Sequence, residues 1–174
     1  MVATAARTAR ALATTHYDLA LNLGVCGSFD PALAPGTVVH VIADRVAELG
    51  AEDGEDFLTL TDLNLAADDA VANASPPQNA ALHALPAVRG ITVNTVHGHQ
   101  PSIDAVVRRF NPQVESMEGA AFMHACVLSG VPFAQVRAVS NVVERRNRQA
   151  WRLGEAIQNL SATARTIIDR VGLR

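Results

Sequence analysis

Residues 114–141 read VESMEGAAFMHACVLSGVPFAQVRAVSN, and this stretch decides the fold. Its first half predicts an apolar helix over 119–128, which ends where Gly130 can adopt the left-handed conformation that caps a helix. Pro132 cannot extend that helix, because it lacks the backbone N–H that a further turn needs. The apolar run that follows predicts a strand over 133–139.

Polar side chains stand at both ends of this unit. Glu115 and Glu118 precede the predicted helix, and Ser140-Asn141 follows the predicted strand. Open α/β sheets bind their ligands beyond the carboxyl ends of the strands. The stretch therefore predicts a functional site at that edge, and Glu115 is expected to support the site or to pair with an arginine.

The rest of the chain alternates between predicted helices and strands. Helices are expected over 2–14, 80–85, 101–110 and 151–171, and strands over 18–23, 37–42 and 90–96. The acidic segment 43–54 and the polar segment 61–79, which contains Ser75, are expected to be exposed loops, the second with one short helix around 65–72. This alternation predicts one α/β domain over 1–174, with a central mixed sheet flanked by helices.

Composition excludes several classes of function. The formal net charge of −3 gives no basic footprint for nucleic acid. No run approaches the ~20 apolar residues that a membrane-spanning helix needs, so no membrane partner is expected. Cys26 and Cys126 are too few for a disulfide framework and are read as buried free thiols, which favours the cytoplasm.

A metal site is not expected either. His97 and His99 form an H-x-H pair, but zinc sites use three or four protein ligands and the sequence offers no third one nearby. We therefore predict no metal and no other cofactor. The His97–His99 segment is expected to be a loop at the rim of a binding pocket.

Two motifs resemble the purine nucleoside phosphorylase and nucleosidase superfamily. They are MEGAA over 117–121 and VRAVSN over 136–141. Within that superfamily, SNVVERRNR over 140–148, with Trp151 close behind, is most similar to futalosine hydrolases. The resemblance implies a three-layer phosphorylase-like fold and an enzyme that is a homo-oligomer. It also implies hydrolysis of futalosine, a small-molecule purine nucleoside, to hypoxanthine and dehypoxanthine futalosine in menaquinone biosynthesis.

Other readings of the same resemblance stay open. The chain is also compatible with another purine nucleosidase, of the methylthioadenosine/S-adenosylhomocysteine type, or with a nucleoside phosphorylase. The alternative that is not an enzyme is an inactive fragment that binds a nucleoside. Dependence of turnover on phosphate, or binding without turnover, would separate these possibilities.

The resemblance assigns the sugar side of the site. Cleavage of an N-glycosidic bond builds positive charge on the ribosyl ring, which a nearby carboxylate stabilises. Glu118 matches the family's ribose-binding carboxylate, although an acid at a helix start can instead accept from backbone N–H groups. Met117 matches the residue that packs against the sugar, and the loop Val25-Cys26-Gly27 matches the one that lies against the ribose and the attacking water or phosphate.

On the base side of the site, Asn141 differs from the residue that adenosine-type nucleosidases have at this position. The matching residue in adenosine-type nucleosidases is Asp, which can protonate adenine, whereas an amide donates hydrogen bonds but cannot act as an acid. Asn141 therefore points to a 6-oxopurine leaving group, hypoxanthine, while a turn-forming Asn is the alternative. Ser140 beside it is expected to bind substrate. Glu118 and Asn141 are thus the expected catalytic residues. The aryl carboxylate of futalosine is expected to bind one of the three arginines Arg145, Arg146 and Arg148, and we predict Arg148.

One family residue has no match. The family places its water-activating Glu before the first helix, in a strand and glycine-rich turn, and residues 1–17 contain no Asp or Glu. The resemblance therefore implies a chain that is truncated at its N-terminus, with the first strand and the water-activating base upstream of Met1.

Overall fold

The computed structural model describes residues 1–74 and 76–170. Ser75 of the expected polar loop and Val171, the expected end of the last helix, lie outside the described residues. In chain order the elements are α1 (Val2–Thr14), β1 (Ala20–Ser28), β2 (Val38–Val46), β3 (Gly50–Asp53), β4 (Asp56–Thr59), β5 (Ala70–Ala72), α2 (Ala80–His83), β6 (Ala87–Thr92), α3 (Gln100–Phe110), β7 (Val114–Ser116), α4 (Gly119–Ser129), β8 (Phe133–Val142), η1 (Arg148–Ala150) and α5 (Leu153–Asp169).

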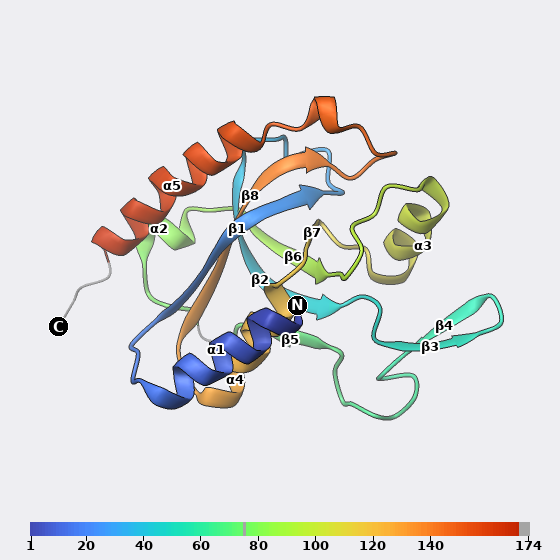
Figure 1. Ribbon diagram of the computed structural model, residues 1–174, viewed down its shortest axis with the longest axis horizontal. Helices are drawn as coiled ribbons and strands as arrows, with labels where there is room; N and C mark the ends of the chain where they lie inside the picture. Colours follow the sequence, from blue (N-terminus) through green and yellow to red (C-terminus); the bar gives the residue numbers. More distant parts are fainter. Residues whose placement is uncertain (75, 171–174) are drawn as a thin grey trace.

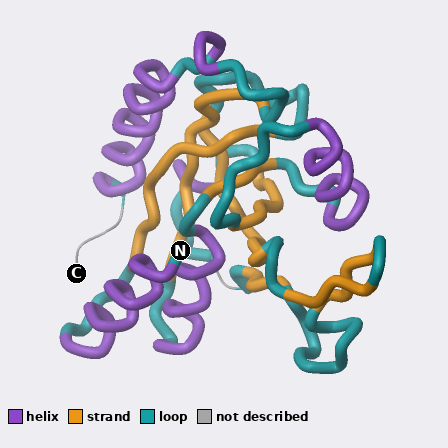
Figure 2. Tube along the Cα trace, turned by 45° about the vertical axis from the view of Figure 1, so that its right-hand side comes forward, coloured by secondary structure: helices purple, strands orange, loops and turns teal. Residues whose placement is uncertain are grey.

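The main sheet is mixed, as the sequence predicted, and it curls on itself (Figure 1). Its strands follow the order β5-β2-β6-β7-β1-β8, and a further pairing of β2 with β8 closes five of them into a ring. β1–β8, β2–β6 and β6–β7 are parallel pairs. β1–β7, β2–β5 and β2–β8 are antiparallel. The small β3–β4 hairpin projects from the body in two views (Figures 1 and 2).

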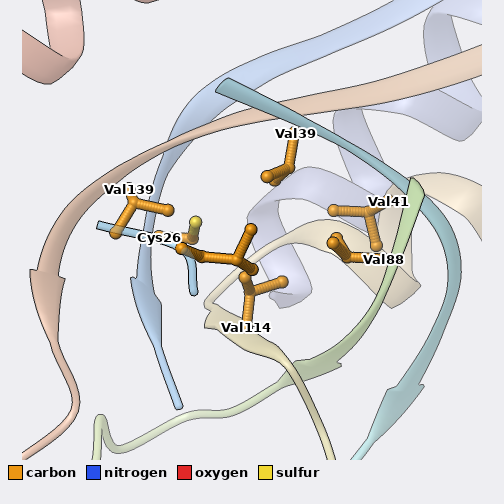
Figure 3. Close-up of a cluster of buried hydrophobic side chains, with 7 residues drawn as sticks. Cys26, Val39, Val41, Val88, Val114 and Val139 are labelled. Carbon is orange, nitrogen blue, oxygen red and sulfur yellow. The ribbon is translucent and has the colours of Figure 1, made fainter. Parts of the chain in front are cut away.

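The ring encloses an apolar cluster to which every ring strand contributes (Figure 3). Its members are Cys26, Leu33, Val39, Val41, Val88, Val114 and Val139, all buried. β-branched valines suit this position, because they favour extended backbone and pack well between strands. The cluster therefore explains why the five strands close around it.

Helices cover the outside of the ring. α5 and α2 lie together on one side, α1 and α4 lie together on another, and α3 stands apart from both pairs (Figure 1). α4 ends as the sequence predicted, with Gly130 in the left-handed conformation at φ 64°. The described residues include no helix with the length and hydropathy needed to cross a lipid bilayer.

Two loop predictions were wrong. Segment 43–54 was expected to be a loop, but β2 continues to Val46 and Gly50–Asp53 forms β3, which pairs with β4. The helix expected around 65–72 is absent from the structure, where Ala70–Ala72 forms strand β5 and pairs with β2. In both places, hydrogen bonds to a neighbouring strand outweigh the local preference of a polar sequence.

A buried polar network ties α4 to the ring. Asp44, on β2, accepts hydrogen bonds from Thr92 Oγ1 at 2.9 Å and from Gln135 Nε2 at 3.0 Å. Thr92 Oγ1 in turn accepts from the backbone N–H of Ala120, in the first turn of α4, at 2.7 Å. A side chain on Gly119 would collide with Asp44, so this glycine lets the helix start against the network. Burial raises the pKa of Asp44 from 3.8 to about 6, although both hydrogen bonds oppose the shift.

We predict that Asp44→Asn removes the part of the pH dependence of the free energy of unfolding that comes from this buried carboxyl group. Because the pKa of Asp44 is higher in the folded protein than in the unfolded chain, the folded state holds its proton more tightly. The resulting stabilisation is fully present below about pH 4 and is lost as pH rises through about 6. The variant should match the wild type near pH 4. At pH 7 it should be more stable by up to ~3 kcal/mol. Urea unfolding of both proteins from pH 4 to pH 7 tests this.

The comparison must be a difference between proteins, because His40 titrates in the same range with the opposite sign. Burial lowers the pKa of His40 from 6.5 to about 4, so its contribution is lost as pH falls, equally in both proteins. Asp62→Asn is a matched control on the surface. Hydrogen bonds from Thr59 lower the pKa of Asp62 from its usual 3.8, so its contribution is lost only below the tested range, and the difference for Asp62→Asn should stay nearly constant from pH 4 to pH 7. A pH-independent difference for Asp44→Asn would contradict the prediction.

Candidate active site

A cavity of about 760 Å³ lies along β1, within the size range of small-molecule sites. Between Ala20 and Cys26, β1 pairs with β8 on one side only, and no other described strand pairs with that part of it. The cavity walls come from α1, β1, β7, α4, β8 and the loops that follow β6, β7 and β8. The expected strand upstream of Met1 stays a prediction.

Two glycines of β1 give the cavity two distinct ends. Gly24 pairs with Arg137 of β8, and Gly27 lies between Asn141 of β8 and Glu115 of β7. Because a glycine has no side chain, the side chains of its neighbours can lie across the strand at these two points. The two glycines are three residues apart, roughly 10 Å along a strand. An irregularity in the β1–β8 register between Cys26 and Gly27 brings Asn141 opposite Gly27.

Glu118 occupies the Gly24 end. Its side chain is 42% exposed, and its carboxylate accepts a hydrogen bond from Arg137 Nη1 at 3.1 Å, while the Arg137 side chain is only 3% exposed. Glu118 is the residue before α4, but its side chain does not accept from the backbone of the helix. The first N–H groups of α4 go instead to Ser116 Oγ and Thr92 Oγ1. The capping alternative for Glu118 is therefore wrong, and its carboxylate borders the cavity.

Arg137 is a site residue that the sequence analysis missed. Its Nε and Nη2 atoms are buried and have no hydrogen-bond partner among the described residues. Its charge lowers the pKa values of Asp44 and of Cys26, against the effect of burial. A signal was present, because an arginine inside an otherwise apolar strand needs a reason to be buried.

Asn141 and Ser140 occupy the Gly27 end. Asn141 Nδ2 donates to the carbonyl of Val142 at 2.9 Å. The Ser140 hydroxyl lies 2.8 Å from Asn141 Oδ1 and 3.1 Å from the carbonyl oxygen of Cys26, and it can donate to either. These contacts fix the amide plane of Asn141 at the cavity wall.

The expected substrate-binding loop also lines the cavity, through Val25, Cys26 and Gly27. The Cys26 side chain, however, points into the apolar cluster inside the ring (Figure 3). Burial raises the pKa of its thiol to about 12, so Cys26 is not a nucleophile at neutral pH. Any contact of Cys26 with a ligand therefore comes from its backbone.

Met117 lines the cavity and is 39% exposed, as a residue that packs against a ligand would be. Arg148 does not line it. Arg148 lies in η1, exposed, whereas Arg146 borders the cavity with its guanidinium 5.6 Å from the ring centroid of Trp151. The η1 turn carries Arg148 away, so among Arg145, Arg146 and Arg148 it is Arg146 that borders the cavity.

Glu115 pairs with His97 rather than with an arginine. His97 Nδ1 lies 2.6 Å from Glu115 Oε2, and the backbone N–H of His97 donates to Glu115 Oε1 at 3.1 Å. The ring of His97 also stands edge-on to Phe29, with centroids 6.1 Å apart. Within the described part of the chain, His, Cys, Asp and Glu side chains form no group of three or more that could hold a metal ion.

Comparison with known proteins identifies relatives over almost the whole chain. The sequence pattern of the Phosphorylase superfamily matches residues 1–171. Futalosine hydrolase of Streptomyces coelicolor is 39% identical over 149 residues, which are 83% of this chain but only 63% of that protein. Futalosine hydrolase of Thermus thermophilus is 30% identical over 166 residues, covering 92% of this chain and 73% of that one.

Solved structures share the fold. Futalosine hydrolase of Helicobacter pylori strain 26695 superimposes with a TM-score of 0.77 at 14% identity, over 98% of this chain and 76% of that one. A 5′-methylthioadenosine/S-adenosylhomocysteine nucleosidase from Colwellia psychrerythraea 34H, in complex with adenine, gives a TM-score of 0.77 at 22% identity, over 98% and 74%. These structural likenesses confirm the predicted α/β fold and do not distinguish between substrates.

The under-paired guanidinium of Arg137 generates a prediction about stability. Two of its guanidinium nitrogens are buried without a hydrogen-bond partner among the described residues, a desolvation cost that a methionine of similar length does not carry. We expect Arg137→Met to keep or raise the free energy of unfolding, measured in urea at pH 5, where Asp44 is mostly uncharged. The gain would show that the cation is kept for the site rather than for the fold.

Arg45→Met is the control. Arg45 pairs with Asp69 at 2.9 Å and stacks on Phe110 at 5.0 Å, so both partners are present and partly exposed. Its removal should lower the free energy of unfolding by up to ~1 kcal/mol. A loss of more than ~2 kcal/mol in Arg137→Met would instead mark Arg137 as a satisfied structural residue.

Proposed function

Because the chain belongs to the phosphorylase superfamily, and because futalosine hydrolases resemble it over most of its length, we propose that it hydrolyses the N-glycosidic bond of futalosine. The products are hypoxanthine and dehypoxanthine futalosine, an intermediate of menaquinone biosynthesis. The chain spans 63% of the length of the Streptomyces coelicolor relative, so this activity is our proposal for residues 1–174.

One geometric observation carries the proposal. A carboxylate and a carboxamide face one cavity from its two ends, Glu118 near Gly24 and Asn141 near Gly27. The spacing of roughly 10 Å along β1 suits a ribose and a purine placed end to end. Arg137 orients the carboxylate of Glu118, and this carboxylate accepts no hydrogen bond from the backbone of α4. That arrangement supports a nucleoside with its sugar at Glu118 and its base at Asn141.

Glu118 acts at the sugar end in this proposal. As the bond between C1′ and the base breaks, the ribosyl ring becomes positively charged, and a carboxylate beside it stabilises that charge. Glu118 also accepts hydrogen bonds from the ribose hydroxyls. Arg137 keeps the carboxylate aligned through its 3.1 Å contact, and Met117 packs against the sugar. The oxygen of a water molecule then bonds to C1′, and the proton that this water loses balances the charge on the departing purine, which leaves as neutral hypoxanthine.

Asn141 acts at the base end. The electrons of the broken bond move onto the purine, and negative charge develops at N7 and O6 of a 6-oxopurine. An amide N–H that points at those atoms stabilises the leaving base without transferring a proton. Ser140, through its contact with Asn141 Oδ1, helps to keep the amide in that orientation.

We assign the carboxylate of the futalosine side arm to Arg146 in place of Arg148. Arg146 borders the cavity beside Trp151, so a guanidinium and an aromatic face are available together for an aryl carboxylate. We also propose that the protein is cytoplasmic and works as a homo-oligomer. Its two free buried thiols suit a reducing compartment.

The test is to mix the chain with futalosine and to measure hypoxanthine release and, by calorimetry, binding. Release without phosphate supports the proposal. Release that requires phosphate and yields a ribosyl phosphate would assign a phosphorylase instead. Faster release of adenine from 5′-methylthioadenosine would assign the other nucleosidase class. Binding without release would leave only a nucleoside-binding protein.

We predict that Glu118→Gln lowers kcat/KM for futalosine by at least about 30-fold, which corresponds to ~2 kcal/mol of transition-state stabilisation. Glutamine keeps the size and can still accept from Arg137 Nη1, but it carries no charge to oppose the charge on the ribosyl ring. Initial rates of hypoxanthine release at low substrate concentration measure the effect.

Glu52→Gln removes one negative charge from the exposed β3–β4 hairpin and should leave kcat/KM unchanged. If Glu118→Gln behaves like this control, Glu118 has no role at the sugar.

We predict that Asn141→Asp shifts the preference towards adenine-bearing substrates. Aspartate can carry a proton that adenine N7 accepts, and the carbonyl of Val142, 2.9 Å from the present Nδ2, favours a protonated oxygen there. The ratio of kcat/KM for futalosine over 5′-methylthioadenosine should fall at least ~10-fold.

Asn64→Asp makes the same chemical change on an exposed turn and serves as the control. A wild type that already prefers 5′-methylthioadenosine would overturn the role assigned to Asn141.

A further inference from the structure

Glu115 and His97 form a buried pair at the base end of the cavity that the proposed mechanism leaves unused. Glu115 is 4% exposed, and both of its oxygens take hydrogen bonds from His97 alone among the described residues. Both residues line the cavity. A buried carboxylate whose hydrogen bonds all go to one histidine fixes the position of that imidazole ring and its tautomer.

The chemistry of the pair defines which atom of His97 faces a ligand. A carboxylate only accepts hydrogen bonds, so the 2.6 Å contact requires the hydrogen of the imidazole to sit on Nδ1. In the neutral ring, Nε2 then carries a lone pair and no hydrogen. Phe29 holds the ring edge-on from another direction. His97 is thus held at the cavity wall with Nδ1 paired to Glu115, which leaves Nε2 as the ring nitrogen that can accept from a ligand.

The position of the pair relative to Asn141 indicates which part of a purine it meets. A Cβ atom placed on Gly27 would lie 3.3 Å from Asn141 Nδ2 and 3.5 Å from Glu115 Cγ. The side chains of Asn141 and Glu115 therefore both lie beside Gly27. On a purine, O6 and N1 follow N7 along one edge. If Asn141 meets N7 and O6, the next group on the same wall meets O6 and N1.

We infer that His97, oriented by Glu115, is a specificity residue that accepts a hydrogen bond from N1–H of a 6-oxopurine base. Hypoxanthine carries a hydrogen on N1, whereas adenine has a lone pair there, which Nε2 of His97 would repel. A buried acceptor left unpaired, or facing another acceptor, weakens binding strongly. His97 touches the base in this inference, and Glu115 is a positioning residue.

The inference rests on the proposed function, because that function places the base beside Asn141. It adds a second, independent contact that selects the base. Asn141 donates to the edge that carries N7, and N7 accepts hydrogen bonds in hypoxanthine and in adenine alike, so a contact at N1 adds selection that N7 cannot give.

The test measures binding of three free bases to the chain by calorimetry: hypoxanthine, adenine and 1-methylhypoxanthine. The wild type should bind hypoxanthine at least ~10-fold more tightly than the other two, the effect of one lost or repulsive hydrogen bond. His97→Phe keeps a ring against Phe29 but has no acceptor, so hypoxanthine and adenine should bind equally within about threefold. His99→Phe, two residues away and exposed, should keep the wild-type preference.

Glu115→Gln separates positioning from a merely structural role. A glutamine amide can donate to Nδ1, which permits a hydrogen on Nε2, and the preference should then move towards adenine. Nitrogen-15 NMR of His97 should show hydrogen on Nδ1 only in the wild type and on Nε2 in the variant. A purely structural Glu115 would weaken all three bases alike.

Several outcomes would overturn the inference. They are equal binding of 1-methylhypoxanthine and hypoxanthine, an unchanged preference in His97→Phe, or hydrogen on Nε2 in the wild type. If any of these occurs while the wild type still releases hypoxanthine from futalosine, the inference fails and the proposed function stands. If the wild type binds none of the bases and releases none, both fail.

Discussion

Among the described residues, strand β1 pairs with β8 along its whole length on one side and with β7 at only two residues on the other, and these pairings place the groups at both ends of the cavity. Backbone hydrogen bonds to β8 fix which residue of β8 faces each glycine of β1, and so place Arg137 and Asn141. The short pairing with β7 brings Glu115 beside Gly27. A register change of one residue would exchange inward and outward side chains along the strand and would dismantle both ends together.

Charge is distributed around Arg137 in a way that serves the cavity more than the fold. Its guanidinium lies between the buried Asp44 network and the half-exposed Glu118, and two of its nitrogens lack protein partners among the described residues. Buried polar groups are normally paired, and exceptions concentrate where a protein binds or reacts. The N-terminus of α4 contributes to the same end, because Thr92 and Ser116 satisfy its N–H groups and leave Glu118 free.

Sequence reasoning succeeded where the signal is local. Helix α1 and the end of α4 were predicted correctly, since alanine-rich sequence and Gly130 act through their own backbone. The β3–β4 hairpin was missed although Asp53-Gly54 is a turn signal, because the acidic residues around it look like a solvated loop. Strand β5 had no local signal at all.

The site divides in the same way. Glu118 and Asn141 could be predicted as site residues because they lie inside a recognisable motif, and the structure places both at the cavity. Arg137 and the His97–Glu115 pair were not found, because their partners are set by pairing between distant strands. Arg146 replaced Arg148 for a local reason, since a short turn redirects the chain between them.

The closure of the ring has a consequence for the order in which the protein folds. β8 joins both β1 and β2, with Val38 opposite Ala138, so the pairing that completes the ring links segments far apart in the chain. Such long-range contacts form late and slowly. During synthesis, the valines that meet inside the ring stay exposed until β8 leaves the ribosome, and neither Arg137 nor Asn141 exists before then. A compact core and a binding cavity therefore arise in the same step, and a chain that stops before β8 has neither.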